Sequence, residues 1–212
     1  MNNRLYGFFS GFPTHSFPVS IAELLCKELI QRNSLVFVSV WPSDHSKNDY
    51  ESTGMHGMFA EIGLPFAQHH IIDDRMDSQL AEKIVFEASC IFLMGGHPGL
   101  QMQFLRDMGL DNVIRASSAP LFGVSAGAIN MAIHSLDTKE SPIPYKGLGL
   151  ADITIKPHFE LNNEQMLSSL LQISMNLPIY STEDNSAIFV KGDKISTAGK
   201  IHRINKGEIS TL

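Results

Sequence analysis

Ser125 lies between Gly123 and Gly127 in the segment GVSAGA, which has the Gly-x-Ser-x-Gly pattern of a nucleophile elbow. A serine hydroxyl at such a turn can attack a carbonyl carbon, because the flanking glycines allow a tight turn without clashing with the neighbouring backbone. The sequence that follows is helical in pattern, so the N–H of Ala126 is a candidate donor to a developing oxyanion. The alternative is a serine that only caps a helix, since the pattern also occurs by chance.

A second glycine pair, Gly95 and Gly96, follows the apolar run CIFLM and leads into another helical pattern. In a parallel sheet the carboxyl ends of the strands border one crevice, so this loop is expected to face Ser125. The N–H of Gly96 or of His97 would then complete an oxyanion hole, and His97 is also a candidate substrate contact. The alternative is a turn that uses glycine for its geometry alone.

A serine nucleophile needs a proton acceptor, and two of the nine histidines are candidates. His158 follows an apolar β-type run and Pro157, where the chain is expected to leave the sheet at the same crevice. His202 lies in the segment KIHRIN and is expected at the surface. His134 is expected on the helix that begins at the elbow, too far along it to reach Ser125. Solvated positions are expected for five others: His15, His45, His56, His69 and His70.

These candidates require a particular order of strands and helices. Over the first two thirds of the chain, apolar β-type runs alternate with segments of helical period, which indicates buried parallel strands joined by helices. The strands are expected at 4–10, 34–41, 90–96 and 119–125. The helices are expected at 20–33, 46–62, 78–88 and 98–108. Ser20 and Glu23 predict a capping box for the first of these helices.

The pattern changes after Leu150. A strand at 152–156 and a helix at 163–175 precede short β-type runs at 186–190, 194–199 and 201–205, which are separated by glycine-containing turns. The predicted fold class is therefore α/β: a doubly wound, mostly parallel sheet flanked by helices, with C-terminal β-hairpins at its edge. No linker or repeat interrupts the chain, so residues 1–212 are expected to form one domain.

Composition limits the partners and the location. The net charge of −6 and the absence of a Lys/Arg cluster argue against nucleic acid, and no apolar stretch approaches the roughly 20 residues of a membrane span. A cytoplasmic protein is expected, with Cys26 and Cys90 reduced and inert in apolar runs. No metal or cofactor is expected either. His69 and His70 would point to opposite faces of a strand, and the glycine loops lack the phosphate-binding and dinucleotide-binding patterns.

Taken together, GVSAGA, the Gly-Gly loop, KPHF at 156–159, EDNSAIFV at 183–190 and SGFP at 10–13 resemble the dipeptidase E and cyanophycinase family of serine peptidases. That family has a fold similar to the class I glutamine amidotransferases, which are flavodoxin-like. The resemblance implies that Ser125 is the nucleophile, that His158 is the general base and then acid, and that Gly96 and Ala126 supply the oxyanion donors. It also implies a small peptide or amide substrate. A monomer or homodimer is expected. His97 stands where the family commonly has asparagine.

The acid that orients the histidine is the open position of the expected triad. The resemblance offers Asp137 or Glu140 after the elbow helix, or Glu183 or Asp184 before a late strand. Aligning EDNSAIFV on the family's late-strand pattern favours Asp184. A solvated turn at 183–184 is the alternative.

The sequence also bears on which substrates are preferred and on which other functions are possible. Aspartyl dipeptidases of this family carry basic residues after Pro-His-Phe, whereas the segment at 162–175 has no Arg or Lys, so a preference for Asp-X substrates is doubtful. A pocket of Met166, Leu167 and Leu170 is expected instead. An α/β-hydrolase esterase using Ser125, Asp184 and His202 is one alternative, and a non-catalytic binding or regulatory protein is another. Patatin-like lipases lack support because no Asp-Gly occurs, and a glutaminase would need cysteine at position 125.

Overall fold

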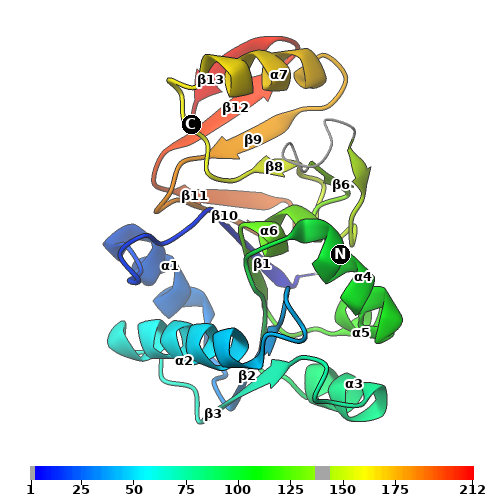
Figure 1. The fold of residues 1–212 in the computed structure, drawn as a ribbon. Helices are drawn as coiled ribbons and strands as arrows, with labels where there is room; N and C mark the ends of the chain where they lie inside the picture. Colours follow the sequence, from blue (N-terminus) through cyan, green and yellow to red (C-terminus); the bar gives the residue numbers. More distant parts are fainter. Residues whose placement is uncertain (1–2, 137–143) are drawn as a thin grey trace.

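The computed structural model describes residues 3–136 and 144–212 and is built around a seven-stranded sheet of order β11-β10-β1-β5-β4-β2-β3 (Figure 1). Five neighbouring strands are parallel, and the β10–β11 hairpin extends the sheet with antiparallel pairing next to β1. The strands are β1 (Leu5–Phe9), β2 (Ser34–Val38), β3 (Gln68–Ile72), β4 (Cys90–Leu93), β5 (Leu121–Val124), β10 (Ala187–Lys191) and β11 (Lys194–Ala198).

Helices cover both faces of this sheet, because its central strands are apolar on both sides. One face packs against α1 (Val19–Glu28) and α2 (His45–Glu61) in a core rich in phenylalanine. The other face packs against four helices. These are α3 (Ser78–Phe86), α4 (Pro98–Asp107), α5 (Leu110–Ala116) and α6 (Ala126–Met131). The doubly wound α/β class expected from the sequence is confirmed.

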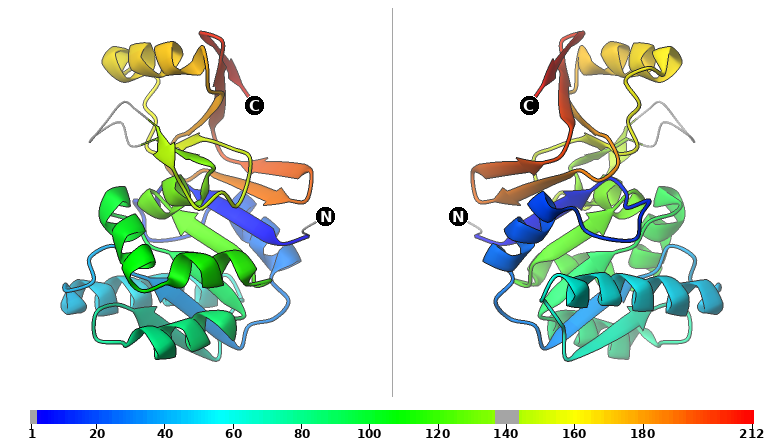
Figure 2. Two further views of the ribbon diagram at one scale, coloured as in Figure 1. Left: turned by 90° about the vertical axis from the view of Figure 1, so that its right-hand side faces the viewer. Right: turned by 90° about the vertical axis from the view of Figure 1, so that its left-hand side faces the viewer.

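A second sheet, of order β13-β12-β9-β8, lies at one end of the molecule with one helix against it (Figures 1 and 2). Its elements are β8 (Ile155–Lys156), α7 (Glu164–Ser174), β9 (Ile179–Thr182), β12 (Ile201–Asn205) and β13 (Glu208–Thr211). Leu170 of α7, Phe159, Ile179 and Ile204 form a small buried core between them. The short pair β6 (His134–Ser135) and β7 (Tyr145–Lys146) completes the described strands.

Four local expectations were wrong. Helix α1 begins at Val19 after Pro18 and has no side-chain cap, so Ser20 and Glu23 form no capping box. Helix α6 ends at Met131, which leaves His134 in a strand rather than on the elbow helix. The strand expected at 152–156 shortens to β8, and Cys26 is exposed rather than part of the core.

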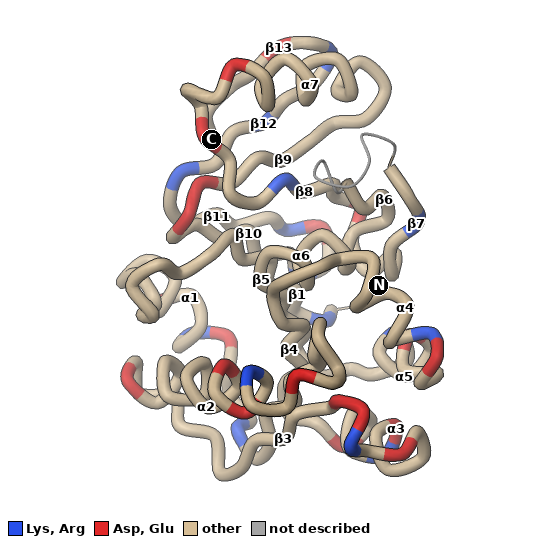
Figure 3. Tube along the Cα trace, viewed as in Figure 1, with Lys and Arg blue, Asp and Glu red and all other residues tan. Residues whose placement is uncertain are grey.

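The edge strand β3 was not expected, because its sequence QHHII has no long apolar run and only its last residue is fully buried. None of the helices in the described ranges is both long and apolar enough to cross a membrane. Acidic and basic residues are interspersed at the end of the molecule that holds α2, β3 and α3 (Figure 3).

Candidate active site

Ser125 occupies a strained turn between β5 and α6. Its φ of +51° lies in the left-handed region, and its N–H is held by the carbonyl of Phe9 at 3.0 Å. A Cβ on Gly123 would come within 2.5 Å of the backbone carbon of Gly127, and a Cβ on Gly127 would meet the carbonyl of Leu93. The expectation that only glycine fits on either side of the serine is confirmed.

His158 links Ser125 to Asp184 through both nitrogens of its ring. Its Nε2 lies 2.9 Å from Ser125 Oγ, and its Nδ1 lies 2.7 Å from Asp184 Oδ1. His158 follows β8, and Asp184 lies between β9 and β10, so residues from both sheets meet at this point. An imidazole in this arrangement can take the serine proton while the carboxylate fixes its tautomer and stabilises the imidazolium.

A buried serine and a glycine after β1 support this chain of hydrogen bonds. Ser10 Oγ accepts the N–H of His158 at 2.8 Å and lies 3.3 Å from Asp184 Oδ1. His158 has a φ of +53°, so its backbone conformation needs such support. A Cβ on Gly11 would come within 2.7 Å of both Asp184 Oδ1 and His158 Cε1. Neither residue is predicted from the sequence to belong to the site, although both stand in the SGFP segment.

Two backbone N–H groups, one at the start of α6 and one in the loop after β4, are candidate oxyanion donors near the serine. Ala126 is the first residue of α6, and Gly96 follows β4 with a φ of +140°. The Gly95–Gly96 loop adjoins the serine, since a Cβ on Gly95 would lie 3.6 Å from Ser125 Cβ. Within the described ranges neither N–H donates to a protein acceptor, which leaves both able to bind a ligand oxygen.

The model of peptidase family S51 matches residues 15–198 of this chain. The chain belongs to peptidase family S51. A curated relative, Peptidase E of Haemophilus influenzae (strain PittGG), is 26% identical over 169 residues, which cover 72% of this chain and 69% of the relative. The protein is therefore a serine-type peptidase that resembles dipeptidase E.

Two solved structures share the fold of this S51 peptidase. A peptidase from an acI-B1 Actinobacterium superposes with a TM-score of 0.75 at 16% identity, covering 99% of this chain and 93% of that one. A Peptidase E protein from Listeria monocytogenes EGD-e gives a TM-score of 0.68 at 18% identity, covering 92% and 98% respectively. At these identities the likeness shows the arrangement of strands and helices.

Of the other acids expected as candidates to orient the histidine of this S51 peptidase, Glu183 contacts a different histidine. Glu183 Oε1 lies 3.2 Å from His202 Nε2, and Glu183 Oε2 lies 3.5 Å from Lys200 Nζ. Asp137 and Glu140 lie outside the described residues. Among the candidate acids that the structure describes, Asp184 is therefore the one that contacts His158.

His202 does not reach the serine. Its expected surface position was wrong: the residue is 6% exposed, packs against Phe159 and also contacts the hydroxyl of Thr211. Its ring is held by Glu183 rather than Asp184, so the structure does not form the Ser125, Asp184 and His202 arrangement of the esterase alternative. In this S51 peptidase His202 stabilises the second sheet.

His97 has a local structural role at the start of α4. Its Nδ1 accepts the N–H of Leu100 at 3.3 Å, and its half-buried ring meets the edge of Trp41 at a centroid distance of 6.1 Å. A side chain that caps a helix satisfies one of the free N–H groups of the first turn. The substrate contact expected for His97 stays a prediction.

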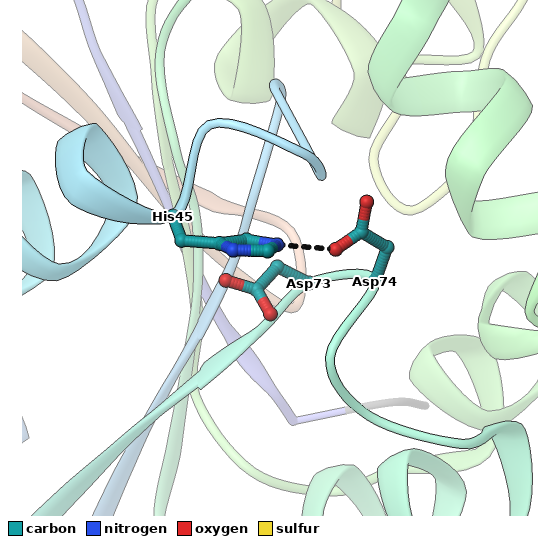
Figure 4. Close-up of side chains that lie close together, drawn as sticks. All are labelled: His45, Asp73 and Asp74. Carbon is teal, nitrogen blue, oxygen red and sulfur yellow. Dashed lines mark hydrogen bonds and ion pairs between the residues drawn. The ribbon is translucent and has the colours of Figure 1, made fainter.

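In the described part of the chain, one group of side chains has metal-ligating chemistry: His45, Asp73 and Asp74, after β3 and at the start of α2 (Figure 4). His45 Nε2 lies 2.5 Å from Asp74 Oδ1. Burial raises the pKa of Asp73. Hydrogen bonds from Arg75 and Asn48 outweigh this effect, so the pKa of Asp73 lies below its usual value. Because the guanidinium of Arg75 already neutralises Asp73, the group serves to fasten β3 to α2.

The apolar side chains expected to line the substrate pocket lie elsewhere. Met166, Leu167 and Leu170 belong to α7 and pack into the core of the second sheet, because that helix turns its apolar face toward β9 and β12. A cavity of about 680 Å³ instead opens beside the serine, between α2 and the ends of β4 and β5.

Proposed function

We propose that this S51 peptidase hydrolyses small peptides through a covalent acyl-enzyme on Ser125, with His158 as general base and acid and Asp184 as the orienting carboxylate. The observation that carries the proposal is the pair of hydrogen bonds on His158, 2.9 Å to the serine hydroxyl and 2.7 Å to the carboxylate. Each distance is short enough for direct proton transfer or orientation.

In the first half of the reaction, Ser125 Oγ forms a bond to the carbonyl carbon of the substrate while its proton moves to His158 Nε2. The carbonyl oxygen becomes an oxyanion, and the N–H groups of Gly96 and Ala126 are proposed to bind it. The C–N bond then breaks as His158 returns the proton to the departing amine. The acid part of the peptide stays on the serine as an ester.

In the second half, a water molecule donates its proton to His158 Nε2 and its oxygen bonds to the ester carbon. The collapse of this intermediate breaks the bond to Ser125 Oγ and returns the proton to the serine. Asp184 keeps its charge throughout and stabilises the imidazolium that forms in each half.

We also propose a domain organisation, an assembly state and a location for this S51 peptidase. We place residues 1–212 in one domain that acts as a monomer or homodimer. The two free cysteines, Cys26 and Cys90, suit a reducing compartment, which supports a cytoplasmic location.

A fluorophosphonate probe tests the nucleophile directly. Incubation of the folded protein with the probe, followed by mass spectrometry of the digested chain, should place the label on Ser125, because only an activated serine reacts. Heat-denatured protein and the Ser125→Ala variant should stay unlabelled. Labelling of Ser125→Ala at the level of the unchanged protein would refute the proposal.

A further inference from the structure

The cavity beside the serine is bounded by the residues that flank the reacting groups. Val124 precedes Ser125, and Gly95 and Gly96 belong to the loop proposed to hold the oxyanion; all three line the cavity. A group bonded to a carbonyl carbon at Ser125 therefore has direct access to it. The volume of about 680 Å³ lies within the range of small-molecule sites.

The floor of this cavity is apolar. Phe37 and Phe92 come from the adjacent strands, and Met94 comes from the loop that follows β4. Helix α2 adds Met55 and Met58. Such a floor favours a hydrocarbon side chain, which gains free energy by leaving water, and opposes a carboxylate, which loses its hydration without forming a hydrogen bond there.

The lysine that lines the cavity already lies close to a carboxylate. Lys47 Nζ lies 3.8 Å from Glu51 Oε1 and 5.7 Å from the centre of the Trp41 ring. Asp49 is held by Arg75 at 2.6 Å. Both carboxylates of the described lining, Asp49 and Glu51, thus already lie close to a cation. An incoming aspartate side chain would have to compete with them for that cation.

We propose that this cavity binds the side chain of the residue whose carbonyl Ser125 attacks, and that it selects large apolar side chains, such as those of leucine and phenylalanine, over aspartate. The assignment rests on the proposed function, since it takes Ser125 as the reacting residue. It names the substrate class as peptides with an apolar residue on the acyl side of the cleaved bond.

Two glycines of α2 provide a matched test. A Cβ added to Gly54 or to Gly57 would meet no atom within 4 Å, so both positions have room for a side chain. Gly54 lines the cavity, whereas Gly57 does not. The Gly54→Phe variant should fill part of the cavity. Gly57→Phe is the matched control, because it makes the same substitution about one helical turn away and outside the cavity.

The experiment compares kcat/KM for the p-nitroanilides of phenylalanine, leucine, alanine and aspartate. The unchanged enzyme should cleave the phenylalanine and leucine compounds about tenfold faster or more than the aspartate compound. Gly54→Phe should lower kcat/KM for the two large substrates by about tenfold, and for alanine by less than about threefold. Gly57→Phe should leave all four within about twofold of the unchanged enzyme.

Other outcomes separate the two proposals. If Ser125 reacts with the fluorophosphonate but aspartate is cleaved as well as leucine, or no apolar compound is cleaved, the cavity assignment is wrong and the nucleophile stands. The same holds if Gly54→Phe and Gly57→Phe act alike on the large substrates. If Ser125 does not react with the probe, the proposed function fails and the cavity assignment fails with it.

Discussion

Glu183 and Asp184 are neighbours in the chain, yet their carboxylates hold different histidines. Asp184 contacts His158, which also contacts the serine, whereas Glu183 contacts the buried His202 of the second sheet. Glu183 directly follows β9, whereas Asp184 lies in the turn that leads to β10, so the two side chains leave the backbone at different points of the fold. Substituting Asp184 therefore tests how His158 is oriented, whereas substituting Glu183 tests how the second sheet is stabilised.

Replacing each acid by its amide separates these roles. Asp184→Asn should lower kcat by roughly a hundredfold or more, because an amide cannot stabilise the imidazolium and favours the wrong tautomer. Glu183→Gln should keep kcat within about threefold of the unchanged enzyme, while the free energy of unfolding falls by about 1 kcal/mol. Kinetics on a cleaved peptide and urea unfolding measure the two effects. A larger loss of kcat in Glu183→Gln would contradict the assignment.

The sequence predicted that Ser125, His158 and Asp184 meet, because a local pattern or a resemblance identifies each of them. Their catalytic roles stay a prediction. Ser10 and Gly11 were not predicted as parts of the site. Ser10 lies 148 positions from His158 in the chain, and its hydrogen bond to that residue exists only after both sheets are assembled. A serine followed by glycine after a strand has no local feature that reveals such a partner.

At the scale of elements, the turn between β5 and α6 is fixed by close backbone packing. Gly127 on α6 leaves no room for a Cβ beside the carbonyl of Leu93, whereas Gly57 on α2 has open space around it. A glycine-to-alanine substitution therefore causes a backbone clash in α6 and none in α2.

Gly127→Ala should lower the free energy of unfolding by about 2 kcal/mol or more, because strand β4 must shift to accept the methyl group. Gly57→Ala should raise it by about 0.5–1 kcal/mol, since alanine restricts the unfolded chain and favours the helix. Thermal or urea unfolding of both variants measures the difference. Equal changes of the same sign in the free energy of unfolding would contradict this account, because they would show that the turn accommodates a methyl group at position 127.

Four of the five parallel strands of the large sheet and most helices were predictable, because their apolar patterns follow from burial on two faces or on one. The edge strand β3 was not, since it is only partly buried and its histidines break the apolar run. The start of α1 was also missed: Pro18 fixes the backbone there, and no side chain caps the helix. Elements with a strongly buried face were therefore predictable from their apolar pattern, and weakly buried ones were not.

At the scale of the whole molecule, the site joins the two sheets. Ser125 belongs to the seven-stranded sheet, His158 follows a strand of the four-stranded sheet, and Asp184 lies on the segment between them. The resemblance predicts a substrate pocket near α7, because aspartyl dipeptidases of the family carry basic residues in the segment after Pro-His-Phe. Helix α7 instead covers its own sheet, and the cavity is formed by α2, which is distant in sequence but adjacent in space.

The value of kcat/KM for His158→Ala tests the central claim most directly. With the proton acceptor removed and the fold intact by circular dichroism, we expect a loss of about a thousandfold or more on any cleaved peptide. His202→Gln, which alters the buried histidine beside Glu183, should retain kcat/KM within about tenfold below its unfolding temperature. A His158→Ala enzyme within tenfold of the unchanged protein would contradict the account, because Ser125 would then be activated by another group.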